Sequence, residues 1–212
     1  MDSEQLLYDI NELNHLFRES ASVETLLDKA VEMVAQRTQS AVCSIYLYNS
    51  QTQELILRAT RGLNPESVGR VRMKIGQGLT GLALQEMRTV CEADASRSPN
   101  YRFFPGIFEE RYNAFLAVPI ARGISKMGVL VVQRDTGQVF IAPDVTALET
   151  VASQLGNIIE NAQFILGIHE PAQETPQGPP AGLKFVKGKM AAEGFAYAPV
   201  MIVDKQRSLS FL

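Results

Sequence analysis

A glycine-rich hexamer is the segment whose residue types and spacing could do chemistry. Residues 76–81, Gly-Gln-Gly-Leu-Thr-Gly, have the spacing G-x-G-x-x-G, which in dinucleotide-binding proteins lets the backbone approach a pyrophosphate at a helix N-terminus. A strand-like segment (71–75) precedes the hexamer, a helix-like segment (79–87) follows it, and Glu92 and Asp94 lie where a ribose-binding carboxylate is expected. One interpretation is therefore a nucleotide site built on Gly76, Gly78 and Gly81.

The strand before the hexamer argues against that interpretation. Charged residues alternate with apolar ones along 70–75, a period of two that predicts a strand with one face in water. A parallel strand of a dinucleotide-binding fold is apolar on both faces. The competing interpretation is a turn that glycine permits between a strand and a short helix.

Composition narrows the function classes. The chain has 212 residues, 46% of them hydrophobic, with a formal net charge of -3 and no basic run of five. A nucleic-acid partner would require a clustered basic face, and no apolar stretch reaches the length of a membrane span. The acidic N-terminus does not resemble a signal peptide. We expect a cytoplasmic protein without nucleic-acid or membrane partners.

The cysteines and histidines do not form a chemical motif. Cys43 and Cys91 lie in apolar strand segments, where they are expected to be small core residues. His15 and His169 are isolated in the sequence. Without short-range pairing these residues give no zinc signature, so neither a metal nor a cofactor is predicted.

The elements that position these residues follow from periodicity. Helices are predicted over 3–19 and over 23–37, the second with Ser22 as its N-cap. Segments rich in β-branched and aromatic residues predict an antiparallel hairpin. Two further segments are apolar on both faces and predict central strands. The hairpin strands are 41–48 and 54–60, and the central strands are 114–121 and 126–133.

A long irregular segment and a long helix complete this region. Residues 94–113 contain five aromatic residues, which favours a functional loop or a lid over a cavity. A helix from Pro143 to about Leu166 has a continuous apolar stripe. That stripe either packs on the chain's own sheet or also contacts a partner's helix, which would give a homodimer through the terminal helices. The expected dimer residues are Leu6, Ile10, Leu13, Phe17, Leu148, Leu155, Ile159 and Ala162.

The C-terminal part has a different composition. Residues 167–182 are rich in Pro, Gly and Gln, which is typical of a linker. Residues 183–212 regain a strand-like pattern but are too few to bury a core alone. We therefore expect one domain over 1–166 and the start of a truncated second domain over 183–212.

The order of elements, with four sequence stretches, resembles a GAF domain over about residues 5–166. The stretches are 74–81, 113–120, 128–132 and 157–162. The resemblance implies an α+β fold with a mostly antiparallel sheet of five or six strands. The N- and C-terminal helices are expected on one face of the sheet, and loops and short helices on the other.

The tail carries a second resemblance. Residues 188–200 are similar to the opening segment of the Enzyme I proteins that use phosphoenolpyruvate, although Ala192 and Glu193 replace the usual Ser-Pro pair. Together the two matches resemble the phosphoenolpyruvate–protein phosphotransferase of the nitrogen phosphotransferase system. This implies a bacterial regulatory part that responds to glutamine or 2-oxoglutarate. Neither histidine has the family's phosphorylation context, so no activity is expected of this fragment. The HPr-like carrier that accepts the phosphate would meet the missing catalytic part.

Within a GAF domain the ligand pocket lies between the sheet and the segment that follows its third strand. A small anionic metabolite needs an arginine to hold its carboxylate, and Arg102 and Arg111 are the preferred candidates. The resemblance implies a pocket built from Tyr46, Arg72, Met73, Leu79, Cys91, Asp94, Arg102, Phe104, Phe108, Glu109, Arg111, Tyr112 and Phe115.

Two alternatives to a metabolite sensor stay open. One is a GAF domain that only dimerises and transmits contacts, with a filled pocket and no ligand. The other is the nucleotide-binding domain, which requires a parallel sheet. A partly polar cavity under residues 94–113 would distinguish the sensor from the contact module.

Overall fold

The computed structural model describes residues 15, 22–107, 109, 111–135 and 137–165, and it describes only the backbone of 161–165. Six strands form one sheet in the order β3-β2-β1-β6-β5-β4, and every neighbouring pair is antiparallel. The strands are β1 (Val42–Asn49), β2 (Glu54–Arg61), β3 (Arg72–Lys74), β4 (Val90–Glu92), β5 (Ala114–Arg122) and β6 (Ser125–Arg134). The expected α+β fold is confirmed, and the parallel sheet of a dinucleotide-binding fold is excluded.

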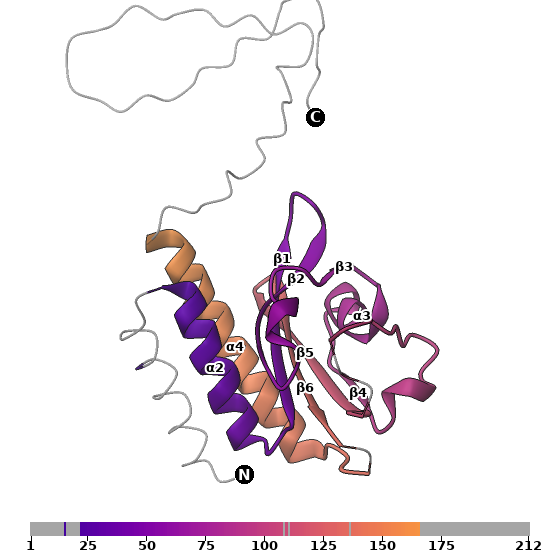
Figure 1. The fold of residues 1–212 in the computed structure, drawn as a ribbon. Coiled ribbons are helices and arrows are strands. Elements are labelled where there is room, and N and C mark those ends of the chain that lie inside the picture. Colours follow the sequence, from indigo (N-terminus) through magenta and orange to yellow (C-terminus); the bar gives the residue numbers. More distant parts are fainter. Residues whose placement is uncertain (1–14, 16–21, 108, 110, 136, 166–212) are drawn as a thin grey trace, which may run out of the picture. The chain divides into compact units, whose positions relative to one another are not determined.

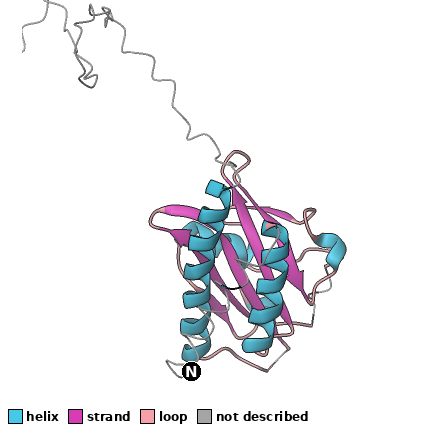
Figure 2. Cartoon of the chain, turned by 90° about the vertical axis from the view of Figure 1, so that its left-hand side faces the viewer, coloured by secondary structure: helices cyan, strands magenta, loops and turns pink. Residues whose placement is uncertain are grey.

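Two long helices cover one face of the sheet (Figures 1 and 2). They are α2 (Val23–Arg37) and α4 (Ala142–Ile165). Ser22 caps α2, because its side chain accepts a hydrogen bond from the Thr25 amide at 3.1 Å. The apolar sides of both helices pack with the inward residues of β1, β5 and β6 into the larger core. The predictions for both helices are therefore confirmed.

The other face of the sheet carries α3 (Gly78–Glu86) and the irregular segment that follows β4 (Figure 1). A second core forms here, in which residues of β1, β2, β5 and β6 pack against Leu79, Ala83 and Leu84 of α3. Two short 3-10 turns, η1 (Pro65–Ser67) and η2 (Ala95–Arg97), shape the loops. Cores on both faces explain why most residues of 114–121 and 126–133 are apolar, whichever face they occupy.

The strand β5 is only partly internal. Its partner β4 pairs with Phe115, Leu116 and Ala117 alone, so beyond Ala117 β5 has a neighbour only in β6. Pro119 lies in this stretch. The prediction of a central strand over 114–121 is thus correct up to Ala117, and wrong beyond it, where β5 pairs with β6 alone.

Several expectations fall outside the described part of the chain. They are the linker over 167–182, the second domain over 183–212 and the helix over 3–19, of which only residue 15 is described. These boundaries stay predictions. In the described part, no helix is both long enough and apolar enough to cross a membrane.

Candidate functional site

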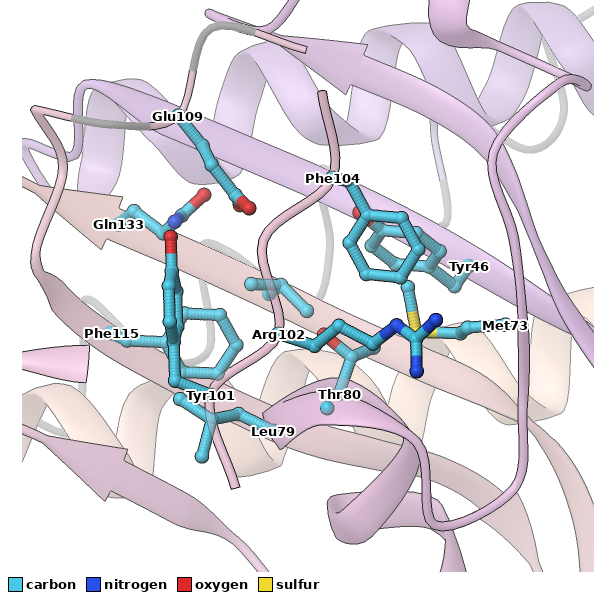
Figure 3. Close-up of a pocket in the computed structure, with 12 residues that line it drawn as sticks. Tyr46, Met73, Leu79, Thr80, Tyr101, Arg102, Phe104, Glu109, Phe115 and Gln133 are labelled. Atoms are coloured by element: carbon cyan, nitrogen blue, oxygen red, sulfur yellow. The ribbon is translucent and has the colours of Figure 1, made fainter. Parts of the chain in front are cut away.

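A pocket lies on the α3 face of the sheet, beneath the segment that follows η2 (Figure 3). Strands β1, β3, β5 and β6 form its floor, the start of α3 forms one wall, and Tyr101, Arg102, Phe104 and Glu109 cover it. Its lining residues are Tyr46, Met73, Gly78, Leu79, Thr80, Tyr101, Arg102, Phe104, Glu109, Phe115, Val131 and Gln133.

The glycine hexamer builds the α3 wall. Gly76 and Gly78 have φ values of +79° and +67°, which glycine adopts without strain. A Cβ at Gly81 would lie 2.7 Å from the Lys74 carbonyl oxygen, so only glycine lets α3 pack this close to β3. The hexamer is a tight connection, as its second interpretation held, and it directs the start of α3 toward the pocket.

The start of α3 is suited to a negatively charged group. The first amides of a helix have no partner within the helix, and the side chain of the N-cap residue Gln77 makes no capping hydrogen bond. Gly78, Leu79 and Thr80, the first three residues of α3, line the pocket. Thr80 is buried and adds a hydroxyl group there.

Two opposite charges lie at different sides of the pocket. Figure 3 shows the Glu109 carboxylate toward Gln133 and the Arg102 guanidinium toward Met73. Burial raises the pKa of Tyr46, and the nearby Glu109 carboxylate raises it further. The Tyr46 phenol therefore stays protonated and can donate a hydrogen bond. The pocket thus offers a cationic end, an anionic end and neutral donors between them.

Gln133 joins the floor of the pocket to its cover. Its Nε2 donates to the Tyr112 carbonyl oxygen at 3.3 Å, and the side chain is buried. Tyr112 itself packs outside the pocket with Val42, Leu63 and Ile107. This hydrogen bond ties the segment after residue 101 to β6.

The pocket is nearly filled by its own side chains. Its volume is about 30 Å³, room for one or two water molecules. An amino acid would fit only if the covering side chains, such as Arg102 and Phe104, moved outward. Arg102 is exposed and Phe104 half-buried, so part of the cover faces solvent.

Seven of the residues expected to line a ligand pocket do lie around it. They come from β1, β3, α3 and β5 and from the covering segment. They are Tyr46, Met73, Leu79, Arg102, Phe104, Glu109 and Phe115. Phe108 lies outside the described residues.

Two of the expected lining residues lie on the wrong face of the sheet. Arg72 is paired with Glu54 at 3.6 Å and is exposed, on the opposite side of β3 from Met73. Cys91 is exposed and pairs in register with Leu116, which belongs to the helix-side core. The prediction of Cys91 as a core residue is also wrong, whereas Cys43 is fully buried as expected.

Three others, Asp94, Arg111 and Tyr112, lie in the loop outside the pocket lining. Asp94 caps η2 by accepting from the Ser96 amide at 3.2 Å. Arg111 is exposed and lies over the Tyr112 ring, 4.7 Å from its centre. Of the two arginines preferred for a carboxylate, only Arg102 lines the pocket.

The sequence analysis missed five lining residues: Gly78, Thr80, Tyr101, Val131 and Gln133. Gly78 and Thr80 belong to the hexamer, whose place before a helix was itself a signal. Gln133 follows four apolar residues, 129–132, in an expected central strand. A polar side chain at such a position is a signal for a pocket residue.

The expected dimer residues of α4 lie inside the protomer. Leu148, Leu155 and Ile159 are 0, 0 and 1% exposed and pack in the helix-side core. They cannot form a surface for a partner while the protomer is folded. Leu6, Ile10, Leu13, Phe17 and the side chain of Ala162 lie outside the described residues.

Comparison with known proteins gives the family. The GAF domain family matches residues 20–160. The chain belongs to the GAF domain family. Among the described residues no cluster of His, Cys, Asp or Glu is placed to hold a metal ion.

The relatives are phosphotransferase proteins. The chain is 28% identical over 171 residues to the phosphoenolpyruvate-dependent phosphotransferase system protein of Escherichia coli K12. That match covers 81% of this chain and 22% of the E. coli protein. It is 34% identical to the crystal structure of the GAF domain of an Acinetobacter phosphoenolpyruvate–protein phosphotransferase. That match has a TM-score of 0.68 and covers 79% of this chain and 99% of the other.

A GAF domain from a Coxiella burnetii phosphoenolpyruvate–protein phosphotransferase is 27% identical. Its TM-score is 0.72, and the match covers 79% of this chain and 99% of that one. The chain thus spans about a fifth of the E. coli relative's length and corresponds to nearly the whole of these solved GAF domains.

Proposed function

We propose that this chain is the regulatory sensory part of a phosphoenolpyruvate–protein phosphotransferase. It binds a small nitrogen metabolite in the pocket beneath residues 101–109 and controls autophosphorylation in a nitrogen-related phosphorelay. A catalytic part in the remainder of the protein would pass the phosphate to a separate HPr-like phosphocarrier, and the protein would be cytoplasmic. The fragment itself performs no transfer.

The pair of opposite charges in the pocket carries this proposal. Arg102 and the start of α3 suit a carboxylate, and Glu109 suits an ammonium group. Free glutamine has both groups, whereas 2-oxoglutarate has two carboxylates and no cation. The charges therefore favour glutamine, whose side-chain amide would bind Gln133 in competition with the Tyr112 carbonyl.

Thermal unfolding of the 212-residue chain tests this proposal. Glutamine at 100 times its dissociation constant should add about 2.7 kcal/mol of stability, a shift in Tm of roughly 5–10 °C. Arg102→Ala should weaken binding by roughly 10-fold or more, because a hydrogen bond to a charged group is lost. Arg111→Ala is the matched control, since Arg111 lies outside the pocket, and it should bind normally.

The small volume of the pocket favours a second candidate, a GAF domain that dimerises and transmits contacts without a ligand. In that case no metabolite shifts Tm, whether glutamine, 2-oxoglutarate, a cyclic nucleotide or NAD. A shift with NAD alone would instead revive a nucleotide site at the glycine hexamer.

Neutralising Glu109 should change the binding of glutamine and of 2-oxoglutarate in opposite directions, which provides a sharper test. Glu109→Gln removes the group proposed to hold the ammonium, so glutamine should bind more weakly. The same change removes a repulsion against 2-oxoglutarate, whose binding should strengthen or first become detectable. Calorimetric titration of both compounds measures the two effects, and weakening of both to the same degree would contradict the assigned role of Glu109.

A further inference from the structure

Two successive residues at the end of β6 face opposite sides of the sheet. Gln133 lines the pocket and holds the Tyr112 carbonyl. Because side chains alternate along a strand, its neighbour Arg134 points toward the helices, where it contacts Asp144 of α4. One peptide unit thus separates a pocket residue from a residue that holds the helical layer.

Arg134 holds the beginning of α4. Its Nη1 and Nη2 donate to the two Asp144 carboxylate oxygens at 3.2 Å each, a bidentate pair whose geometry is restrictive. The Asp144 carboxylate also accepts from the Ile141 amide at 3.0 Å. The guanidinium stacks 4.3 Å from the centre of the Phe140 ring. Every one of these contacts lies at the start of α4.

The same guanidinium reaches α2. Its Nη2 donates to the carbonyl oxygen of Thr38, the C-cap residue of α2, and its Nη1 donates to the Val139 carbonyl at 3.3 Å. The side chain is only 13% exposed. Among the described residues, the buried Arg134 Nε has no hydrogen-bond acceptor. The guanidinium therefore has one unused donor, which a shift of the side chain can bring to an acceptor.

We propose that Gln133 and Arg134 couple the pocket to the helical layer, with Arg134 as the positioning residue for the start of α4. A ligand that takes the Gln133 amide competes with the Tyr112 carbonyl and shifts the end of β6. The bidentate pair with Asp144 transmits that shift, because it tolerates little misalignment. The role of the ligand rests on the proposed function, but the mechanical link does not.

A second arginine provides a matched control. Arg122, at the end of β5, also joins the sheet to α4, through Asn157 at 3.3 Å and Glu160 at 2.6 Å. Neither Arg122 nor its neighbours line the pocket. It therefore tethers the other end of α4 without a link to the site.

Hydrogen–deuterium exchange of the 212-residue chain tests the link without any ligand. Gln133→Leu should speed exchange at residues 139–148 by roughly five-fold, about the effect of one lost hydrogen bond, and leave residues 155–160 unchanged. In an Arg134→Lys background, which retains the charge but not the bidentate geometry, the same substitution should have little additional effect. Arg122→Gln should affect only residues 155–160.

The outcomes separate this proposal from the proposed function. Unchanged exchange at 139–148 in Gln133→Leu, or an undiminished effect in the Arg134→Lys background, would overturn the coupling. A second arm uses glutamine, which should alter exchange at 139–148 in the wild type but not in Arg134→Lys, although both bind it. If glutamine binds neither protein, the sensor proposal fails, while the Gln133→Leu arm still decides the coupling. If Gln133→Leu does not fold, the glutamine arm decides it.

Discussion

At the scale of residues, the two cysteines differ most in their surroundings. Cys43 is fully buried and Cys91 is exposed. Burial raises the pKa of both thiols, and the Glu92 carboxylate adds to the effect at Cys91. Since the thiolate is the reactive form, both should react slowly near neutral pH, Cys43 because it is also inaccessible.

Thiol labelling should therefore modify one cysteine in the folded protein. Cys91 should react with a rate that keeps rising with pH beyond the range of an ordinary thiol, and Cys43 should react only after unfolding. Glu92→Gln should speed labelling of Cys91, because removing a negative charge lowers its pKa. Mass spectrometry of labelled peptides measures both sites, and Cys91→Ser is the control that should abolish labelling of folded protein.

The facing of single side chains was the least predictable part of the site. The alternation along 70–75 already placed Arg72 on the water face, so including Arg72 in the pocket went against that pattern. Strand β4 has three residues, too few to show a period from which the face of Cys91 could be predicted. Where a loop covers a sheet, as at Arg111 and Arg102, spacing carries no directional information. The structure decides between them because Arg102 lies next to the start of α3, with its Cβ 3.6 Å from where a Gly78 Cβ would be.

At the scale of elements, α4 approaches β5 through a glycine. A Cβ at Gly156 would lie 2.7 Å from the Ala121 carbonyl oxygen. Gly156→Ala improves helix propensity by about 1 kcal/mol, but overpacking typically costs about 1–3 kcal/mol. We expect a net loss of up to about 2 kcal/mol in the free energy of unfolding, measured with urea.

The control for this substitution is Ser153→Ala. Ser153 lies on the exposed side of the same helix, so the change should raise stability by a few tenths of a kcal/mol through propensity alone. Equal gains in both variants would show that α4 does not depend on close backbone contact at Gly156.

Long elements were predictable where short ones were not. The apolar stripe of α2, the cap at Ser22 and the β-branched and aromatic residues of β1 and β2 are local signals that the sequence shows directly. The apolar stripe of α4 was equally clear, but a stripe does not say what covers it. The stripe is compatible with packing on the sheet or on a partner's helix, and the structure places Leu148, Leu155 and Ile159 in the core against the sheet.

At the scale of the whole molecule, this assignment changes how a dimer should be tested. Leu155→Ala removes a fully buried side chain and should cost about 2–5 kcal/mol of stability. It should not simply yield a folded monomer. Urea unfolding and light scattering measure the two effects, again with Ser153→Ala as the control. A folded, fully stable monomer from Leu155→Ala would restore the earlier assignment of Leu155 to a dimer interface.

The two cores lie on opposite faces of the sheet. The helix-side core includes the buried side chains of α2 and, among the described residues, the large ones of α4, whereas the pocket lies over the other core. The sequence predicted this division through strands that are apolar on both faces. It could not predict the size of the pocket, which depends on how far the covering side chains fill it.

The edge of β5 beyond Ala117, where β4 no longer pairs with it, has a consequence for behaviour in concentrated solution. An open strand edge invites another molecule to add its own strand, and such additions can continue into aggregates. Pro119 lies in that stretch and has no backbone hydrogen to donate. Because Pro119 cannot donate a backbone hydrogen bond, it should weaken the addition of another molecule's strand along this part of β5.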